Sequence, residues 1–303
     1  MLPLNRYSAK WLTIDNQLQK FQNFDSMGQE FFIGGNYDRH TTNSSPGLPS
    51  TQSNGGDAVV GYQKVFGEKL LGGLTLGYYH APFSLGNNQG SIKYNELTFT
   101  AFASYKFGAI YTNFLANYSN LNFTSSRNIV LGPFNSVENG KTNGKQFGGR
   151  GQLGYNFTIN KLIHGPLVGL MWERINTNGF SEISSSVTAM TFGDQTRESL
   201  RSKIGWQITG ETDVLRVKIY PYIQSTYDYE HKQDNRFYSA GFVNGVSSMS
   251  IPTSNKTGGY GTLQAGINIE LNKIISIGIS GLTTISQPGA QNSSINTMLS
   301  MKC

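Results

Sequence analysis

The sequence predicts an all-β protein, a twelve-stranded antiparallel transmembrane β-barrel with an N-terminal α-helix in or near its pore. First, apolar and polar residues alternate in runs of about 10 to 16 residues, whereas a soluble strand usually has about 5 or 6. Second, short turns and longer polar stretches alternate between these runs. Third, charged residues make up only 14% of the 303 residues, against about 25% in an average soluble domain. A chain with one lipid-facing and one wetted face has this composition.

Residues 1–25 are expected to form a linker helix. Their apolar residues recur at alternating spacings of three and four, which is the period of one helix face. Such a helix could pack on a protein surface or thread through the pore of a barrel, and the sequence alone leaves both arrangements open. The apolar face consists of Leu4, Tyr7, Trp11, Ile14, Leu18 and Phe21.

Residues 26–303 are expected to form the barrel itself. From about Gln29 onward the apolar residues recur with period two, so each strand has one apolar and one polar face. A soluble β-sandwich alternates in the same way, but its strands are shorter than the about 9 to 11 residues that a tilted strand needs to cross a bilayer. The clearest runs lie at 97–105, 200–208, 215–223, 261–271 and 275–280.

The connections between the strands are of two kinds. Five short turns and six long polar loops separate twelve strands, which places both chain ends on the short-turn, periplasmic side of an outer membrane. Closure of the barrel leaves no open edge, as lipid requires because it cannot hydrogen-bond to the backbone. Short turns are expected near 67–68, 108–109, 161–165, 211–213 and 272–273. Long loops are expected near 39–56, 83–92, 122–144, 176–195, 232–256 and 286–293.

Aromatic residues near the strand ends suit the girdles that mark the two membrane–water interfaces. Ordinary cross-strand packing is the alternative explanation of the same residues. The candidates for the girdles are Tyr78, Tyr79, Phe83, Trp172, Tyr227 and Tyr229.

Several other classes of protein are not indicated. The net charge of +6 comes from residues scattered along the strands, so nucleic-acid binding is not expected. No run of about 18 apolar residues is present, so no transmembrane helix is expected. The start of the chain has no apolar core of a signal peptide, from which we expect a fragment of a longer precursor or a broken reading frame. No metal site or cofactor is expected, because no thiolate cluster exists and no pair has metal-ligand spacing among His40, His80, His164 and His231.

Part of the chain resembles a known family, the autotransporter β-domains. The stretches GPLVGLMWER at 165–174 and GFSE at 179–182 look like the central strand pair of these domains. The following stretch, SVTAMTFGDQTRESL at 186–200, with Gly205 and Trp206 after it, is similar to the translocators attached to GDSL-type esterase and lipase passengers. The resemblance covers most of the chain.

The resemblance implies a twelve-stranded barrel with a linker helix in its pore and a passenger polypeptide N-terminal to the helix. It implies insertion into the bacterial outer membrane with help from the barrel-assembly machinery. The esterase passenger with its nucleophilic serine is absent, so no esterase activity and no catalytic residue are expected. Family members usually end on an aromatic residue that the assembly machinery reads, whereas the outward row of the last strand, with Leu299 and Met301, ends here on Cys303.

The polar face of the strands carries the candidate site residues. If the apolar face meets lipid, the charged residues of the other face line the lumen, where they can pair across strands, bind a pore helix or attract a passing polypeptide. Four of the cations fall on adjacent strands, and because like charges repel we expect an acidic or carbonyl partner, such as Glu173 or the last carbonyls of the helix. We hypothesise that this cluster, Arg201, Lys203, Arg216 and Lys218, holds the linker helix. The full lumen-facing set is Arg150, Arg197, Arg201, Lys203, Arg216, Lys218 and Glu270.

The predicted function is that of an outer-membrane translocator and anchor for export of an N-terminal passenger. Two alternatives stay open: an outer-membrane barrel enzyme with a site at its rim, and a passive porin. Candidates for the rim site are Asp38 with His40, and His231 with the acidic residues around it, because a carboxylate beside a histidine can orient it for acid–base chemistry. The expected partners are the lipid bilayer with its lipopolysaccharide, the barrel-assembly machinery and the passenger; no nucleic acid is expected, and the chain is expected to be a monomer.

Overall fold

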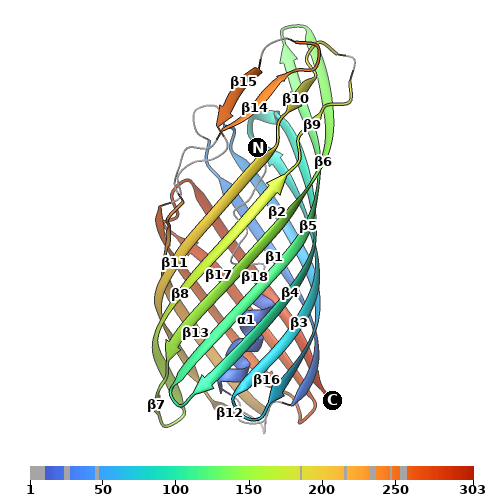
Figure 1. The fold of residues 1–303 in the computed structure, drawn as a ribbon. Coiled ribbons are helices and arrows are strands. Elements are labelled where there is room, and N and C mark those ends of the chain that lie inside the picture. The colour runs from blue at the N-terminus through green and yellow to red at the C-terminus, as the bar shows by residue number, and fades with distance from the viewer. Residues whose placement is uncertain are drawn as a thin grey trace.

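The computed structural model describes residues 11–23, 28–44, 48–184, 186–214, 217–232, 237–245, 248–252 and 258–303. Most of them belong to one tall barrel of strongly tilted strands (Figure 1). Fourteen strands share the barrel sheet, and two of these, β7 (Phe157–Ile159) and β12 (Thr212–Val214), are three-residue extensions at the turns, which leaves twelve spanning strands. The predicted fold class is therefore confirmed.

All twelve spanning strands are antiparallel to their neighbours. Each pairs with the spanning strand that follows it, and β1 pairs with β18 from Glu30 opposite Lys302 to Thr42 opposite Ala290, which closes the barrel. Closure gives every strand two partners and removes the open edges. The strands are β1 (Gln29–Thr42), β2 (Thr51–Phe66), β3 (Leu70–Leu85), β4 (Gly90–Phe107), β5 (Ile110–Leu131), β6 (Phe134–Tyr155), β8 (Leu162–Thr177), β11 (Gln195–Gly210), β13 (Val217–Glu230), β16 (Gly259–Glu270), β17 (Ile275–Ile285) and β18 (Ala290–Lys302).

The outer and inner faces of the wall differ as the alternation predicts. Large apolar side chains such as Val168 and Leu170 on β8 are 47% and 53% exposed on the outside. On the other face of the same strand, Leu167, Met171 and Glu173 are buried inside the barrel. A β-sandwich would bury the apolar rows between two sheets, whereas here they face outward around the closed barrel. Among the described residues, no helix is both long and apolar enough to cross a bilayer.

The short turns lie near their expected positions, except that the turn expected at 161–165 lies before Leu162, where β8 begins. The prediction of a long loop at 122–144 is wrong. Strands β5 and β6 continue through this stretch as a hairpin, paired from Asn122 opposite Asn143 up to Leu131 opposite Phe134. Gly132 turns the chain with a φ of 61°, which suits glycine. Most of the stretch is polar on both sides because the hairpin rises beyond the barrel wall, where both of its faces meet water, although its tip exposes Val130 and Leu131.

Two further predicted loops contain strands. Within 176–195 lie β9 (Phe180–Ser181) and β10 (Met190–Phe192), and within 232–256 lie β14 (Phe237–Phe242) and β15 (Ser248–Pro252). These four strands form a small sheet, β15-β14-β10-β9, above the barrel next to the tip of the β5–β6 hairpin (Figure 1). The remaining connections are shorter than expected, and a 3₁₀ turn, η2 (Gly86–Asn88), lies in the link between β3 and β4.

The aromatic girdle prediction holds only in part. Tyr78, Trp172 and Tyr227 are exposed on the outer face, as is Tyr229. The prediction is wrong for Tyr79 and Phe83, which are only 3% and 4% exposed and lie on the inner face. Consecutive residues of a strand point to opposite faces, so Tyr78 and Tyr79 cannot both face lipid.

The helix α1 (Leu12–Asn23) lies inside the barrel, at the end where the short turns are (Figure 1). Side chains from Trp11 through Gln22 are buried, except that Asp15 is partly exposed. A helix of 12 residues is only marginally stable alone in water, so contacts with the barrel wall must stabilise it. Of the two arrangements left open by the sequence, the structure has the helix in the pore; Leu4 and Tyr7 of the expected apolar face lie outside the described residues.

Candidate functional site: the helix in the barrel lumen

The lumen wall hydrogen-bonds to the helix along its polar face. Asn16 donates from Nδ2 to Asn296 Oδ1 at 2.5 Å and to Ser280 Oγ at 2.9 Å, and it accepts a hydrogen bond from the Tyr222 hydroxyl. These partners come from three different strands, β18, β17 and β13. Buried amide groups are costly unless both their donors and their acceptors are paired, so this set of bonds fixes the rotation of α1 about its axis.

Gln17 extends the same contact one residue further along the helix. Its Nε2 donates to Ser300 Oγ at 2.8 Å, and its Oε1 accepts from Gln63 Nε2 at 2.8 Å. Thr13, about one turn before Gln17, accepts from Asn296 Nδ2 at 2.8 Å. Together with Asn16, these residues join the helix to the seam where β18 meets β1.

A buried ion pair holds the periplasmic end of the helix. Lys20 donates from Nζ to both carboxylate oxygens of Glu30 at 2.8 Å, and to Ser276 Oγ at 2.8 Å. The two charged side chains are only 1% and 0% exposed. Gln63 Nε2 adds a second donor to the Glu30 carboxylate at 3.1 Å. An ion pair removed from water is stable only when its remaining polar atoms are also bonded, and these contacts meet that condition.

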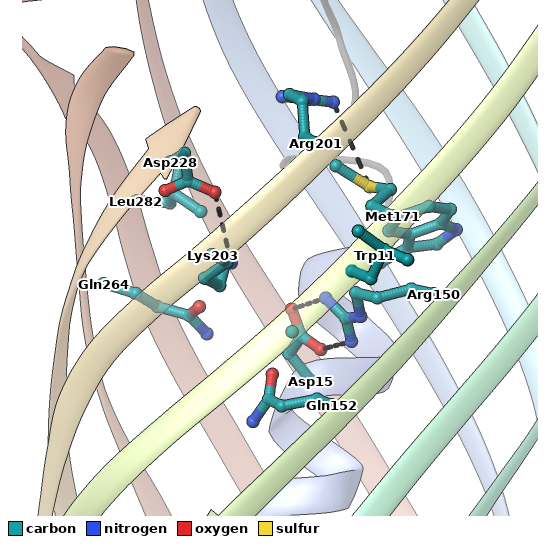
Figure 2. Close-up of a pocket in the computed structure, with 12 residues that line it drawn as sticks. Trp11, Asp15, Arg150, Gln152, Met171, Arg201, Lys203, Asp228, Gln264 and Leu282 are labelled. Atoms are coloured by element: carbon teal, nitrogen blue, oxygen red, sulfur yellow. Dashed lines mark hydrogen bonds and ion pairs between the residues drawn. The ribbon is translucent and has the colours of Figure 1, made fainter. Parts of the chain in front are cut away.

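A second ion pair binds the first turn of the helix to the opposite part of the wall. Arg150 on β6 donates from Nη1 and Nη2 to the two carboxylate oxygens of Asp15, a fork-to-fork geometry that fixes direction as well as distance (Figure 2). The same guanidinium lies 5.3 Å from the ring centroid of Trp11. Asp15 near the helix N-terminus also interacts favourably with the helix dipole.

The apolar side of the helix packs against inward-facing wall residues. Ile14, Leu18 and Phe21 belong to a buried cluster with residues of strands β1, β3, β4, β5, β8, β13 and β18, among them Phe32 and Phe102. Lys106 Nζ lies 4.4 Å from the centroid of the Phe21 ring. Apolar packing and hydrogen bonds thus both hold the helix in the lumen.

Gly34 lets the helix approach the wall closely. A Cβ atom at this position of β1 would lie 2.7 Å from Thr13 Cγ2 and 3.2 Å from the backbone oxygen of Thr297. Any larger residue would push α1 away from β1 and β18, where most of its hydrogen bonds are made.

Two small cavities lie beside the helix among the described residues. One, of about 20 Å³, lies between Trp11, Asp15, Arg150 and the wall residues Lys203 and Asp228 (Figure 2). Another of about 20 Å³ is lined by Thr13, Ile14 and residues of β2 to β4. Each has room for about one water molecule.

The structure brings some of the predicted lumen-facing residues together. Arg150, Arg201 and Lys203 surround the first of these cavities, and Arg201 is buried. Arg201 donates to the Tyr260 hydroxyl at 2.5 Å and lies 4.0 Å from Glu230, while Lys203 lies 3.9 Å from Asp228. The acidic groups next to these two cations thus belong to the adjacent strand β13. Each cation of β11 stands opposite a carboxylate of β13, Arg201 opposite Glu230 and Lys203 opposite Asp228, a pairing that was not predicted from the sequence.

Other predicted residues lie at the two ends of the lumen. Arg197 lies near the extracellular mouth and acts electrostatically on His40 across it. Glu270 lies 3.6 Å from Lys302, and Lys218 lies 3.7 Å from Glu211 at the exposed periplasmic rim. Arg216 lies outside the described residues.

The contacts between helix and wall were not predicted from the sequence. They are made by Asp15, Asn16, Gln17 and Lys20 of the helix, and on the wall side Glu30 is the partner of Lys20. The sequence did contain a signal for Glu30. It lies between the outward residues Gln29 and Phe31 of β1, so the period of two places its side chain inside the barrel. A carboxylate that faces the lumen at the start of a strand can form a buried ion pair with a lysine of a pore helix, as Glu30 does with Lys20.

The two candidate rim sites differ from an acid–histidine arrangement. His231 is exposed, contacts the outward Tyr229 ring and lies 2.9 Å from Ser202 Oγ, while Asp228 and Glu230 point into the lumen. Asp38 and His40 both point inward, but Asp38 accepts from the Tyr79 hydroxyl at 3.0 Å and His40 contacts Asn292. Within the described residues, no group of three or more His, Cys, Asp or Glu could hold a metal ion; Asp234 lies outside them.

The residues predicted for membrane insertion lie on the outer face of β18. Leu299 and Met301 are exposed there, and so is Cys303 just beyond the strand. The Cys303 amide donates to the Gln29 oxygen at 3.0 Å, so the end of β18 remains paired with β1.

Comparisons with known proteins agree with this architecture. The family model of the autotransporter beta-domain matches residues 31–281. The translocator domain of the autotransporter NalP from Neisseria meningitidis superposes with a TM-score of 0.72 at 14% identity, covering 99% of this chain and 100% of that one. The beta domain of the Bordetella autotransporter BrkA superposes with a TM-score of 0.63 at 15% identity, covering 91% and 100%.

Two curated relatives are longer proteins. Esterase EstA of Pseudomonas aeruginosa is 27% identical over 196 residues, which are 62% of this chain and 30% of the relative. Lipase 1 of Photorhabdus luminescens is 25% identical over 132 residues, 43% of this chain and 20% of the relative. The matches therefore span less than a third of the length of these relatives. Since the family model covers most of the sequence and the barrel matches solved translocator domains, the chain belongs to the autotransporter β-domain family, the outer-membrane translocators of type V secretion.

Proposed function

We propose that this barrel carries a passenger polypeptide, attached ahead of α1, across the outer membrane and then anchors it there. The observation that carries the proposal is the burial of α1 in the lumen, bonded to the wall through Asp15, Asn16, Gln17 and Lys20. A helix bonds its own backbone groups internally, so it can remain inside the barrel after export as a stable plug.

The inner wall suits the passage of an unfolded segment. An extended polypeptide exposes its backbone N–H and C=O groups. Each such group costs on the order of several kcal/mol when it has no hydrogen-bond partner in an apolar medium. Buried threonine, asparagine and glutamine side chains line the inner faces of the strands, for example Thr100, Asn113 and Gln146. Such groups exchange hydrogen bonds with a passing chain without binding one sequence specifically.

The charged lumen residues take different roles in this proposal. Arg150 holds the helix through Asp15. The carboxylates beside Arg201 and Lys203 belong to β13 and not to the helix. We therefore assign these two cations to keeping the wall polar and to contacting the passing chain. Of the remaining charges predicted for the lumen, Arg197, Lys218 and Glu270 act at the ends of the path, and Arg216 lies outside the described residues.

We infer that the passenger is a hydrolase of the esterase or lipase class, because the curated relatives that share this barrel carry those names. The barrel itself contributes no catalytic group in this proposal. Its further partners are the barrel-assembly machinery and the lipids of the outer membrane, lipopolysaccharide included, which contact the exposed apolar rows.

Conductance in a planar lipid bilayer tests the plug. The full chain should conduct weakly, and deletion of residues 1–25 should raise the conductance several-fold, because α1 occupies the lumen and two cavities of about 20 Å³ lie beside it in the described part of the chain. Arg150→Glu should raise it more than Arg201→Glu, since only Arg150 pairs with a helix carboxylate in the described contacts. A full chain that conducts as strongly as the truncated one is a porin, and the translocator proposal then fails.

A further inference from the structure

The outer face changes from aromatic to cationic toward the extracellular ends of several strands. On β1 the outward Tyr37 is followed toward the extracellular end by Arg39. On β6 Phe147 is followed in that direction by Lys145, and on β8 Trp172 is followed by Arg174. In each case the two residues are two positions apart and therefore on the same face. An aromatic ring marks the membrane interface, so each cation lies just outside the apolar core, at the depth of the lipid headgroups.

Three exposed cations lie near the extracellular ends of β6, β8 and β13, with Lys145 on β6, Arg174 on β8 and Lys232 just beyond β13. Arg174 stands opposite Phe147 and diagonal to Lys145 in the β6–β8 register. Arg174 Nη1 lies 3.6 Å from Glu198 Oε1, and Lys232 Nζ lies 3.9 Å from Glu198 Oε2. We call Lys145, Arg174, Lys232 and Glu198 the headgroup cluster.

The headgroup cluster keeps an excess of positive charge. It contains three cations and one carboxylate, so its formal charge is 3 − 1 = +2. Both ion pairs are longer than a hydrogen bond, and the side chains of Arg174 and Lys232 are 48% and 47% exposed. Pairs of this kind contribute little to stability, so folding alone does not account for placing these charges together.

The chemistry of the cluster fits a phosphorylated lipid. A guanidinium binds phosphate oxygens through two parallel N–H donors, and lysines on either side add point charges. The ring of Trp172 and the apolar residues Leu170 and Val168 below it on β8 offer a surface for acyl chains. The protein thus presents cations above an apolar surface. This order matches an amphiphile with an anionic headgroup whose acyl chains lie in the membrane.

We propose that the headgroup cluster binds the phosphate groups of a phosphorylated glycolipid of the extracellular leaflet. The proposal rests on the outer-membrane placement and deepens the lipid contact of the proposed function by naming its site. Arg174 is the central phosphate ligand, Lys145 and Lys232 flank it, and Trp172 contacts the sugar or the first part of the acyl chains.

The test measures lipid retention by the refolded full chain in detergent micelles. Lipid A with two phosphate groups is titrated, and native mass spectrometry counts the retained molecules while Trp fluorescence reports a change near Trp172. The triple variant Lys145→Gln, Arg174→Gln, Lys232→Gln should bind about tenfold or more weakly, as expected for loss of charge-assisted bonds. The matched control removes three cations at the periplasmic end, Lys69→Gln, Lys161→Gln and Lys273→Gln, and should bind as the original chain does.

Further measurements separate the sources of binding. Lipid A without phosphates should bind as weakly to the original chain as lipid A does to the triple variant, and millimolar inorganic phosphate should not displace bound lipid. Equal retention by the triple variant, equal retention of dephosphorylated lipid, or displacement by free phosphate overturns the proposal. Heat-induced mobility shifts on gels show whether each variant has folded, and Arg174→Gln alone is measured if the triple variant has not. The conductance test of the plug is independent of lipid retention, so failure of one proposal is distinguishable from failure of the other.

Discussion

At the scale of single residues, the buried Lys20–Glu30 pair makes the most sensitive contact between helix and wall. Replacing Lys20 with Met leaves the Glu30 carboxylate in the lumen with Gln63 as its nearest remaining donor. Loss of one partner of a buried pair costs about 3–5 kcal/mol. We therefore expect Lys20→Met to lower the free energy of unfolding by about that amount, measured by urea denaturation of the refolded chain in detergent.

A double variant provides the control for this pair. In Lys20→Met, Glu30→Met both charges are gone and no carboxylate is left unpaired, so the loss of stability should be clearly smaller than for Lys20→Met alone. If the two variants are equally unstable, the loss of stability comes from lost packing of the Lys20 side chain and not from an unpaired Glu30 carboxylate.

The sequence predicted which face of a strand a residue occupies but not which residue it meets. Alternation placed Arg150 and Arg201 in the lumen, and both are buried there. Their different partners, Asp15 on the helix and Glu230 on β13, depend on the depth and rotation of α1 and on the register between β11 and β13. Those quantities come from many contacts far apart in the chain, so no local pattern contains them.

At the scale of elements, the β5–β6 hairpin supports the small extracellular sheet through charged contacts. Arg127 on β5 donates to both carboxylate oxygens of Glu182, at 2.9 and 2.5 Å, and to the Thr188 backbone oxygen at 2.8 Å. Glu138 on β6 accepts from Ser136 at 2.6 Å and from Thr188 at 2.7 Å. The segment from Glu182 to Thr188 is thereby attached to the hairpin, outside the membrane.

This attachment should weaken in acid. Hydrogen bonds from the hydroxyls of Ser136 and Thr188 lower the pKa of Glu138 from 4.5 to about 2. Since the pKa is lower in the folded state, the stabilisation is complete above about pH 4.5 and is lost as the pH falls toward about 2. Hydrogen exchange of residues 180–192 should accelerate over this range in the original chain.

The variant Glu138→Gln isolates this carboxylate. Its exchange rates at pH 6 should already be raised, and the step between pH 4.5 and about 2 should be reduced. A step of unchanged size in the variant would show that another acidic group of the hairpin is responsible.

The spanning strands were predictable because one face of each strand meets the polar lumen and the other meets lipid. This difference enforces a period of two in the sequence over the whole length of the strand. The extracellular strands were not, because that constraint ends where the membrane ends. In β6 the stretch Asn135–Asn143 is polar on both faces, which resembles a loop in sequence although it pairs residue by residue with β5. Pairing along a hairpin depends on the backbone and leaves no period in the side chains when both faces are wet.

At the scale of the whole molecule, the size of the lumen limits what can pass. Barrels of about 8 strands are filled by their own side chains, and those of about 16 to 18 hold an aqueous channel. This barrel of twelve strands accommodates one helix with cavities of about 20 Å³ beside it. A helix with side chains is about 10–12 Å wide, whereas a folded domain of about 100 residues has a radius of gyration of about 13 Å. A single extended or helical segment fits this space, and a folded domain does not.

A passenger that cannot unfold should therefore stall. We expect a reporter domain of about 100 residues, fused ahead of Met1 behind a secretion signal and stapled by one disulfide, to remain largely inside the cell, because the staple prevents the extended form that the lumen admits. The same reporter with both cysteines replaced by serine should reach the surface, where added protease cleaves it on intact cells. Heat-induced mobility shifts of the barrel in both strains check that it has assembled. If the stapled and unstapled reporters are cleaved equally, the passage must open wider than the lumen around α1, and the barrel alone does not set its width.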